Sequence, residues 1–431
     1  MTRKPESINR QIAAIALPAI AANITIPLPG LVDVAITGHF GSEIFISAIA
    51  VGGAMFNMLY WLVNFLRTGT TGFTAQAVGA RDEARQILTL YRSIAAALLL
   101  GLALLILSQP VGNFILNFLD ADGRTAYVAR QYFDIGIWGA PAVTMGYAFS
   151  GWFLGMQNAR AQMAVAVSIN VLNVLLSIAL VFGFGMQIEG VALGTVTAQW
   201  TGLIIAAAIT YRKYRPALPP LKEIVDPKAL RSYFRVNSDI FLRTACLVAV
   251  TLWFTHAGAV QGSTILAANA LLLQLFMLFS FFIDGFAFAG EALAGKYSGA
   301  GDTSGLNHII GRLMLIGSVC ALTCSTLYLI AGETFMRLLT DDTGVRTVAA
   351  YFLPWTFAVP LCGFAAFVWD GIFVGLVRSR AMVVAMAVAV AVFALTYIAT
   401  RSMGNDGLWL AFNAYLLARG LTFTAIYLYK K

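Results

Sequence analysis

The sequence predicts an all-helical membrane protein in which twelve transmembrane helices form two pseudo-symmetric bundles of six. Three observations predict this fold class. The 431 residues are 59% hydrophobic and only 11% charged, whereas a soluble globular domain carries about 25% charged residues. Twelve apolar runs are long enough to cross a bilayer, and the second half of the chain repeats motifs of the first. This composition also excludes a disordered or collagen-like chain.

The apolar runs have the length that a helix needs to cross the hydrocarbon core, roughly 17–25 residues. They are apolar at every position rather than at alternate positions, which favours helices over the strands of a membrane barrel. The first run is too long for a cleaved signal peptide and is interrupted by prolines, so we interpret it as an uncleaved span. In order, the predicted spans are residues 10–37, 44–66, 87–108, 127–150, 162–183, 189–211, 236–258, 264–290, 309–331, 350–374, 381–400 and 407–428.

The basic residues indicate the orientation of the chain in the membrane. If the N-terminus lies in the cytoplasm, 23 of the 28 Lys and Arg residues fall on the cytoplasmic side, as the positive-inside rule requires. Both termini are therefore predicted to be cytoplasmic. The net charge of +8 is explained by this topology, because the basic residues form no patch interleaved with aromatic side chains that would bind nucleic acid.

A repeat with an offset near 220 residues divides the chain into halves. Residues 79–82 match residues 299–302, and residues 151–155 match residues 371–375. Each half holds an even number of spans, so the two halves have the same topology and are expected to be related by an axis along the membrane normal. Two bundles that face each other imply a cleft between them, which alternating access requires.

The longest polar segment lies between these halves and marks the domain boundary. It contains four prolines and several basic residues. We therefore predict an N-lobe over residues 1–215 with the first six spans, a cytoplasmic linker over residues 216–235, and a C-lobe over residues 236–431.

Ionisable side chains within spans are the main functional candidates, since each costs about 2.5–3.5 kcal/mol on insertion scales. Asp33 lies late in the first span. Pro18, Pro27 and Pro29 on this span each remove a backbone donor and can kink the helix. A carboxylate in such a poorly hydrated site has its ionised form disfavoured, which lets it exchange protons. The alternative for Asp33 is a structural carboxylate that caps a neighbouring helix. Asp284, Glu291 and Asp370 in the second half are secondary candidates, and for Asp284 and Asp370 a role at a helix end is the alternative.

Uncharged polar residues form stripes on two neighbouring spans. Asn170, Asn173 and Ser177 share one face of the fifth span, and Thr195 and Gln199 share one face of the sixth. These side chains must face protein or water, and they could line a cavity beside Asp33 and hold its proton. The alternative is that they join helices by hydrogen bonds worth about 0.6 kcal/mol each.

Other residues give no sign of a metal, a cofactor or a catalytic centre. The cysteines lie in apolar runs without a His or carboxylate to complete a metal site. Residues 290–296 nearly match a P-loop, but Tyr297 replaces the Ser or Thr that binds Mg²⁺ and the stretch continues a span. Asp239 and Arg243 are spaced to pair with each other on one helix. With no ATPase domain in the sequence, an ion gradient is expected to drive transport.

Four stretches carry a resemblance to a known family: residues 27–39, 67–80, 283–291 and 369–375. Together they resemble the multidrug and toxic compound extrusion (MATE) family, and more narrowly its bacterial DinF-like branch. The resemblance covers nearly the whole chain. It implies a MATE-like exporter in the bacterial inner membrane that exchanges protons or Na⁺ for amphipathic, often cationic compounds.

The resemblance also implies roles for individual residues. The first-span carboxylate of the family falls on Asp33, its bending proline on Pro18, and its polar partners on Asn173 and Thr195. Some relatives carry a second acidic residue on the fifth span, where this chain has Ser177. The family's Na⁺ site pairs a seventh-span Glu with a tenth-span Asp, and here the seventh span offers no Glu beside Asp370. These departures favour protons over Na⁺.

Two other functions are disfavoured by what the spans lack. A lipid-linked saccharide flippase of the same superfamily usually lines its cavity with several Arg residues, and the spans here offer almost none. A membrane-embedded enzyme would need a catalytic cluster, which the sequence does not show. We therefore expect a monomeric transporter whose partners are small drug-like compounds, protons and the lipid bilayer.

Overall fold

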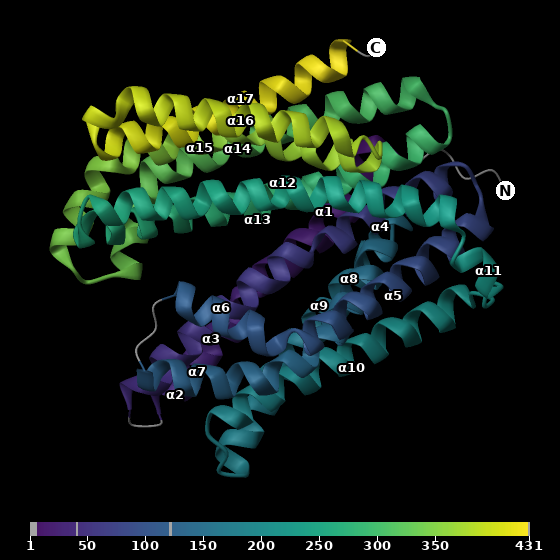
Figure 1. The fold of residues 1–431 in the computed structure, drawn as a ribbon. Helices are drawn as coiled ribbons and strands as arrows, with labels where there is room; N and C mark the ends of the chain where they lie inside the picture. The colour runs from purple at the N-terminus through teal and green to yellow at the C-terminus, as the bar shows by residue number, and fades with distance from the viewer. Residues whose placement is uncertain (1–6, 40–41, 120–122, 430–431) are drawn as a thin grey trace. The chain divides into compact units, whose positions relative to one another are not determined.

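The computed structural model describes residues 7–39, 42–119 and 123–429, which are helical almost throughout and contain no strand (Figure 1). Ten stretches are long and apolar enough to cross a membrane. The predicted spans at 127–150 and 407–428 are also helical, although the first is interrupted by a short 3-10 turn at Ile137–Gly139. Helices therefore occupy all twelve predicted positions. The two chain ends lie outside the described residues, so their cytoplasmic placement stays a prediction.

The first half of the chain contains α1 (Ile8–Thr25), α2 (Pro27–Gly38), α3 (Glu43–Val63), α4 (Phe65–Gly79), α5 (Glu83–Ile106), α6 (Ser108–Phe118), α7 (Gly123–Gly136), α8 (Ala140–Gly155), α9 (Ala159–Ile178) and α10 (Ile188–Tyr214). The second half contains α11 (Leu221–Ile224), α12 (Pro227–Val260), α13 (Ser263–Gly299), α14 (Thr303–Leu339), α15 (Thr343–Gly375), α16 (Ser379–Thr400) and α17 (Asn405–Tyr429). A π-helical turn at Ala179–Gly183 extends α9.

The described chain forms two compact units. The N-unit is Ala21–Tyr233, and the C-unit is the chain from Phe234 onward together with its beginning as far as Ile20. Both boundaries lie inside helices, the first within α1 and the second within α12. The beginning of the first span therefore packs with the second half of the chain, and Gln11 of α1 accepts a hydrogen bond from the Tyr297 hydroxyl of α13 at 3.4 Å.

Helix packing within each unit follows the same plan. In the N-unit, α8 packs on α4 and α5, while α10 packs on α9 and α7. In the C-unit, α15 packs on α13 and α14, while α17 packs on α16 and α15 (green to yellow in Figure 1). The cores are built from Ala, Leu, Ile, Phe and Trp side chains, such as Trp152 in one unit and Trp409 in the other.

The repeat predicted from the sequence is present in the backbone of both units. A Cβ atom on Gly151 of α8 would meet the carbonyl oxygen of Arg67 on α4, and one on Gly371 of α15 would meet the carbonyl oxygen of Ala287 on α13. Both residues of the second pair come 220 positions after those of the first. Small residues let helix backbones approach this closely inside a membrane, so the duplicated glycines hold the same helix pair together in each unit.

The turns at the helix ends repeat as well. Arg81 and Gly301 both have positive φ, at 55° and 69°, one residue before Asp82 and Asp302. Each aspartate caps the next helix, since Asp82 accepts from the Arg85 N–H at 2.9 Å and Asp302 from the Gly305 N–H at 2.8 Å. A carboxylate at this position satisfies an N–H group that the helix leaves unpaired. Internal duplication thus extends to caps and turns.

Candidate functional site

Asp33 lies on α2 in a mainly apolar part of the N-unit. Its residue is 5% exposed, and its Oδ1 atom is buried without a hydrogen-bond partner among the described residues. Apolar side chains of α2, α3 and α10 form a cluster around this level of the helix, including Ile36, Ile49 and Val191. Burying a carboxylate oxygen without a hydrogen-bond donor costs free energy. A functional role would explain why Asp33 is kept at this position.

Three uncharged polar residues from α7, α9 and α10 form a network that reaches Asp33. Asn173 donates from Nδ2 to the Thr195 hydroxyl at 2.7 Å. The Tyr132 hydroxyl lies near the Thr195 hydroxyl and interacts electrostatically with Asp33. Tyr132 is almost completely buried, and its ring lies against Gly52 of α3, where a Cβ atom would come within 2.5 Å of the ring. Tyr132 therefore connects the carboxylate to the polar pair that the sequence predicted.

Ser177 and Gln199 keep buried polar atoms without partners in the described structure, as does the Oδ1 atom of Asn173. The Ser177 side chain lies against Gly194 of α10, where a Cβ atom would come within 2.7 Å of Oγ. The Gln199 side chain lies against Gly139, at the interruption between α7 and α8. Unpaired buried acceptors and hydroxyls in one unit are able to receive a proton, a water molecule or a polar substrate group.

Asn170 lies one turn from Asn173 but makes different contacts. Its Nδ2 donates to both the hydroxyl and the carbonyl oxygen of Thr25 at the end of α1, at 2.8 Å and 3.0 Å. The structure therefore separates Asn170 from the pair formed by Asn173 and Thr195. Its bonds tie α9 to the place where the first span is interrupted.

The first span is broken near its middle rather than at Pro18. Helix α1 runs through Pro18 and ends at Thr25, and α2 begins at Pro27. Pro27 has no N–H group and is well suited to the start of a helix. Pro18 lies in the part of α1 that belongs to the C-unit, two residues before Ile20. The prolines thus mark a helix with two places where it lacks regular hydrogen bonds.

The Asp370 carboxylate of the C-unit accepts hydrogen bonds from two arginines. Arg243 of α12 donates to its Oδ2 atom at 2.6 Å, and Arg419 of α17 donates to the same oxygen. Arg419 is 2% exposed. The expected pairing of Arg243 with Asp239 is wrong: Asp239 instead accepts from the Ser379 hydroxyl at 2.6 Å. Arg243 pairs with Asp370 on α15 rather than with Asp239 on its own helix, because Asp370 is a buried carboxylate that needs a counter-charge.

The other two secondary candidates lie on α13. Glu291 is buried and Asp284 is half-buried, and both interact with other groups of the protein. The backbone of Glu291 lies under Gly375, where a Cβ atom would come within 2.5 Å of its carbonyl oxygen. This part of α13 therefore has a packing role whatever the carboxylates do.

Sequence reasoning missed Tyr132 and Arg419 as members of these clusters. Tyr132 and Phe133 recur as Tyr351 and Phe352 in the second half of the sequence, but this repeat does not indicate a polar network. Arg419 lies close to the chain end, where a basic residue is normally interpreted as a topology signal. Burial of the guanidinium, which only the fold reveals, distinguishes it from the exposed arginines.

No group of three or more His, Cys, Asp and Glu side chains that could hold a metal ion is found within residues 7–39, 42–119 and 123–429. The four cysteines are all free thiols.

Comparison with known proteins places the fold in a family. Residues 18–179 and 240–398 match the MatE family. The chain is 36% identical to the DNA damage-inducible protein F of Escherichia coli K12 over 423 residues, which cover 98% of this chain and 92% of that protein. It is 23% identical to a probable multidrug resistance protein NorM of Thermotoga maritima over 79% of this chain and 74% of that one.

Among solved structures, the chain superposes on the eukaryotic MATE transporter AtDTX14 with a TM-score of 0.86 and 17% identity, covering 98% of this chain and 95% of that one. The match to the family covers both halves of the repeat, and the similarity to the Escherichia coli protein extends over nearly the full length of each chain. The chain therefore belongs to the MatE family of membrane transporters, the family that its sequence resembles.

Proposed function

We propose that the chain is a proton-coupled exporter that moves small amphipathic, often cationic compounds out of the cell by alternating access. The observation that carries this proposal is the buried Asp33 carboxylate with an unpartnered Oδ1 atom. Tyr132, which interacts electrostatically with Asp33, is uncharged, and so are Asn173 and Thr195 of the adjoining polar pair. Because these neighbours carry no charge, binding a proton is the direct way for this carboxylate to become neutral within a span.

The first span would transmit the change in charge. Pro18 has no N–H group, so the carbonyl of Ala14 lacks its usual partner in α1. In the proposed cycle, protonation of Asp33 lets this helix bend near Pro18, and the N-lobe cavity narrows and expels its substrate. The unpaired atoms of Ser177 and Gln199 would then bind either substrate or water.

Protons are favoured over Na⁺ by the C-unit. The carboxylate of Asp370 already accepts hydrogen bonds from Arg243 and Arg419, and these two guanidinium groups take the place that a bound cation would need. Because both arginines are paired with Asp370, they also do not form the free positive lining expected of a lipid-linked saccharide flippase. Na⁺ coupling and flippase activity remain the alternatives to be tested.

The substrate class is supported by the relatives. The Thermotoga maritima protein is named as a probable multidrug resistance protein, and another relative, from Staphylococcus haemolyticus, as a multidrug export protein. We extend that activity to this chain, acting as a monomer in the bacterial inner membrane with both termini in the cytoplasm.

The proposal is tested by replacing Asp33 with Asn in cells that lack their own drug exporters. Asp33→Asn should remove drug resistance to the level of the empty vector while leaving the amount of protein in the membrane unchanged. Asp33→Glu should retain part of the activity, and a protonophore should abolish the resistance that the wild type gives. Asp134→Asn is the matched control, because this exposed carboxylate of the same unit forms only a surface ion pair with Arg130 worth about 0.3–0.5 kcal/mol.

Infrared difference spectroscopy on the purified protein separates coupling from folding. A protonated carboxyl band that titrates in the wild type and is missing in Asp33→Asn supports the proposal. Full export by Asp33→Asn, or a band that is unaffected by the substitution, would falsify it.

A further inference from the structure

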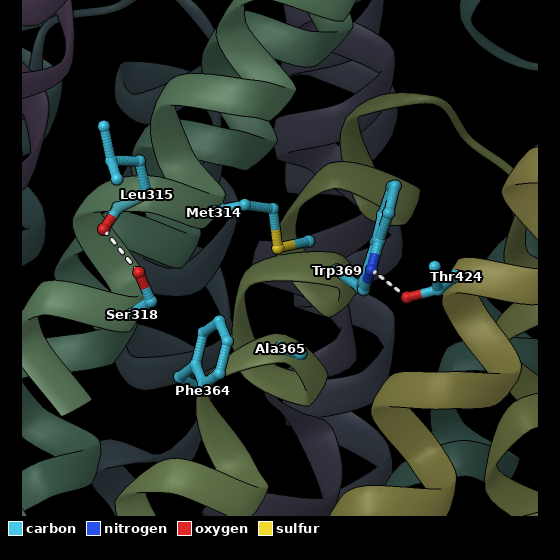
Figure 2. A pocket seen from close by; sticks show the side chains of 7 residues that line it. All are labelled: Met314, Leu315, Ser318, Phe364, Ala365, Trp369 and Thr424. Atoms are coloured by element: carbon cyan, nitrogen blue, oxygen red, sulfur yellow. Dashed lines mark hydrogen bonds between the residues drawn. The ribbon is translucent and has the colours of Figure 1, made fainter. Parts of the chain in front are cut away.

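A groove on the C-unit runs between α14, α15 and α17 and is separate from both polar clusters described above. Figure 2 shows the side chains that line it. Its volume is about 440 Å³, within the range of about 300–1,000 Å³ that small-ligand pockets occupy. It is lined by Met314, Leu315, Ser318, Phe364, Ala365, Trp369 and Thr424.

The walls of the groove present almost no polar atom that could bind a polar ligand. The Ser318 hydroxyl donates to the carbonyl of Leu315 at 2.8 Å, and the Trp369 indole N–H donates to the Thr424 hydroxyl at 2.8 Å (Figure 2). Thr424 in turn donates to the carbonyl of Gly420. With these groups satisfied, the remaining surface is alkyl, aromatic and thioether, which suits a hydrocarbon chain.

The α14 wall of the groove continues into exposed apolar side chains through Leu315, which lines the groove and is itself exposed. Leu315, Val319 and Leu322 are each more than half exposed. In a membrane-spanning helix, such a ridge contacts the acyl chains of lipids. An acyl chain can therefore enter the groove from the bilayer.

One end of the groove is polar and lies towards the start of α14. The Tyr427 hydroxyl donates to Asn307 at 2.7 Å, and the Tyr427 ring lies 4.9 Å from the Trp369 ring. His308, which directly follows Asn307, and Arg312, one turn later on α14, are exposed. Trp and Tyr side chains of this kind are typical of the membrane interface, where an apolar ring meets a polar surface.

Two arginines give this polar end a positive charge. Arg312 lies one turn before Leu315 on α14, and Arg378, just before α16, is exposed and interacts electrostatically with the Tyr427 hydroxyl. The nearest acidic residue in the sequence of α14 is its cap, Asp302, which lies ten residues before Arg312, or about 15 Å along the helix axis. Asp239 of α12 accepts from the hydroxyl of Ser379, the residue after Arg378, and offsets part of the charge of Arg378. Arg312 has no acidic residue within two turns on α14, so this end keeps a positive charge that complements an anion such as a phosphate.

The length of α14 is consistent with the polar end of the groove lying at the level of the lipid headgroups. The helix has 37 residues, about 55 Å at 1.5 Å per residue, while the hydrocarbon core is about 30 Å thick. If the excess is shared between the two ends of the helix, about the first two turns project into the interface. Arg312 then lies at the level of lipid headgroups, and Met314 to Ser318 lie just inside the hydrocarbon region.

We propose that this groove binds one anionic phospholipid of the surrounding bilayer. Its acyl chain lies between α14 and α15 against Phe364 and Trp369, and its phosphate lies at Arg312 and Arg378. The proposed site lies on the lipid-facing surface of these helices. The proposal does not depend on which ion drives transport.

Native mass spectrometry of the purified full-length protein tests the proposal. The probe is an equimolar mixture of phosphatidylglycerol and phosphatidylcholine with identical acyl chains. The wild type should retain one phosphatidylglycerol with a preference of several-fold over phosphatidylcholine. Ser318→Phe, which fills the groove, should lose this retention, and Thr323→Phe, an exposed position of α14 outside the groove lining, should keep it.

The headgroup contact has its own pair of variants. Arg312→Gln combined with Arg378→Gln should reduce the preference for phosphatidylglycerol to near unity, whereas Arg337→Gln, an exposed arginine at the far end of α14, should not. Equal retention of the two lipids by the wild type would overturn the proposal.

A photoactivatable phosphatidylglycerol with a diazirine in its acyl chain tests the location without any substitution. Labelled peptides should contain Met314 or Phe364. Labelling that maps elsewhere, or that is displaced by an exported dye but not by unlabelled phosphatidylglycerol, would also overturn the proposal and assign the groove to another ligand.

Discussion

The amide of Asn173 and the hydroxyl of Thr195 form a 2.7 Å hydrogen bond that joins α9 to α10 in the interior of the N-unit. The same hydroxyl donates to the carbonyl of Val191 at 3.0 Å, so Thr195 acts as donor and acceptor at once. Tyr132 completes the network towards Asp33. One bond between two neutral groups thereby fixes the positions of the Asn173 and Thr195 side chains.

This bond predicts a non-additive pair of substitutions. Asn173→Leu and Thr195→Val should each lower drug export, and the double variant should be no less active than the weaker single variant, because both remove the same interaction. Resistance and dye-efflux rates measure the effect. Asn170→Leu is the comparison, since Asn170 bonds to Thr25 rather than to Thr195. Additive losses in the double variant would contradict a shared role.

Removal of Asp370 should destabilise the C-unit strongly. Asp370→Ala leaves the buried Arg419 and the half-buried Arg243 without their acceptor, and breaking a buried pair costs about 3–5 kcal/mol. Thermal unfolding in detergent should show a large fall in the midpoint. Ser379→Ala, which removes only the hydroxyl that bonds to Asp239, should produce a much smaller change. Equal midpoints for Asp370→Ala and the wild type would show that the arginines find other partners.

The repeated glycines predict equivalent defects in the two units. Gly151→Leu and Gly371→Leu each place a side chain against a backbone carbonyl of the neighbouring helix, so both should reduce the yield of folded protein in the membrane to a small fraction of the wild type. Gly146 lies on the same helix as Gly151 and has open space where its Cβ atom would be. Gly146→Leu should therefore express normally, and a yield as low as that of Gly151→Leu would argue against the packing explanation.

Export should not depend on Na⁺. The Asp370 carboxylate is occupied by two guanidinium groups, and the buried acid of the N-unit has uncharged neighbours suited to a proton. In everted membrane vesicles, replacing Na⁺ with choline should leave drug-driven proton movement unchanged, whereas dissipating the pH gradient should stop it. A several-fold stimulation by Na⁺ at fixed pH would instead favour the sodium-coupled alternative.

Most of the helices and the strongest candidate residue could be predicted because the signals are local. A run of apolar residues identifies a span, and a lone carboxylate such as Asp33 within it has a high energetic cost wherever the run is placed. The duplicated motifs likewise predict that the two halves share one topology. Asn173 and Thr195 could be placed on facing spans because each lies in a stripe with helical spacing.

The C-unit cluster could not be predicted because its partners are far apart in sequence. Arg243 and Asp370 are separated by 127 positions, whereas Asp239 lies one turn from Arg243 and is the obvious partner on a single helix. Arg243 pairs with Asp370 rather than Asp239 because the carboxylate on α15 has less access to water. The break of the first span at Thr25 also escaped notice, because three prolines in one run leave the position of the interruption open.

The division of α1 between two units has a consequence for biosynthesis. The N-unit is continuous in sequence from Ala21 to Tyr233, so all of its parts are available once the first half has been translated. The C-unit also needs the beginning of the chain as far as Ile20, and the partner of Gln11 is made 286 residues later. The segment before Ile20 therefore reaches its contacts with α13 only after the whole N-unit has been translated.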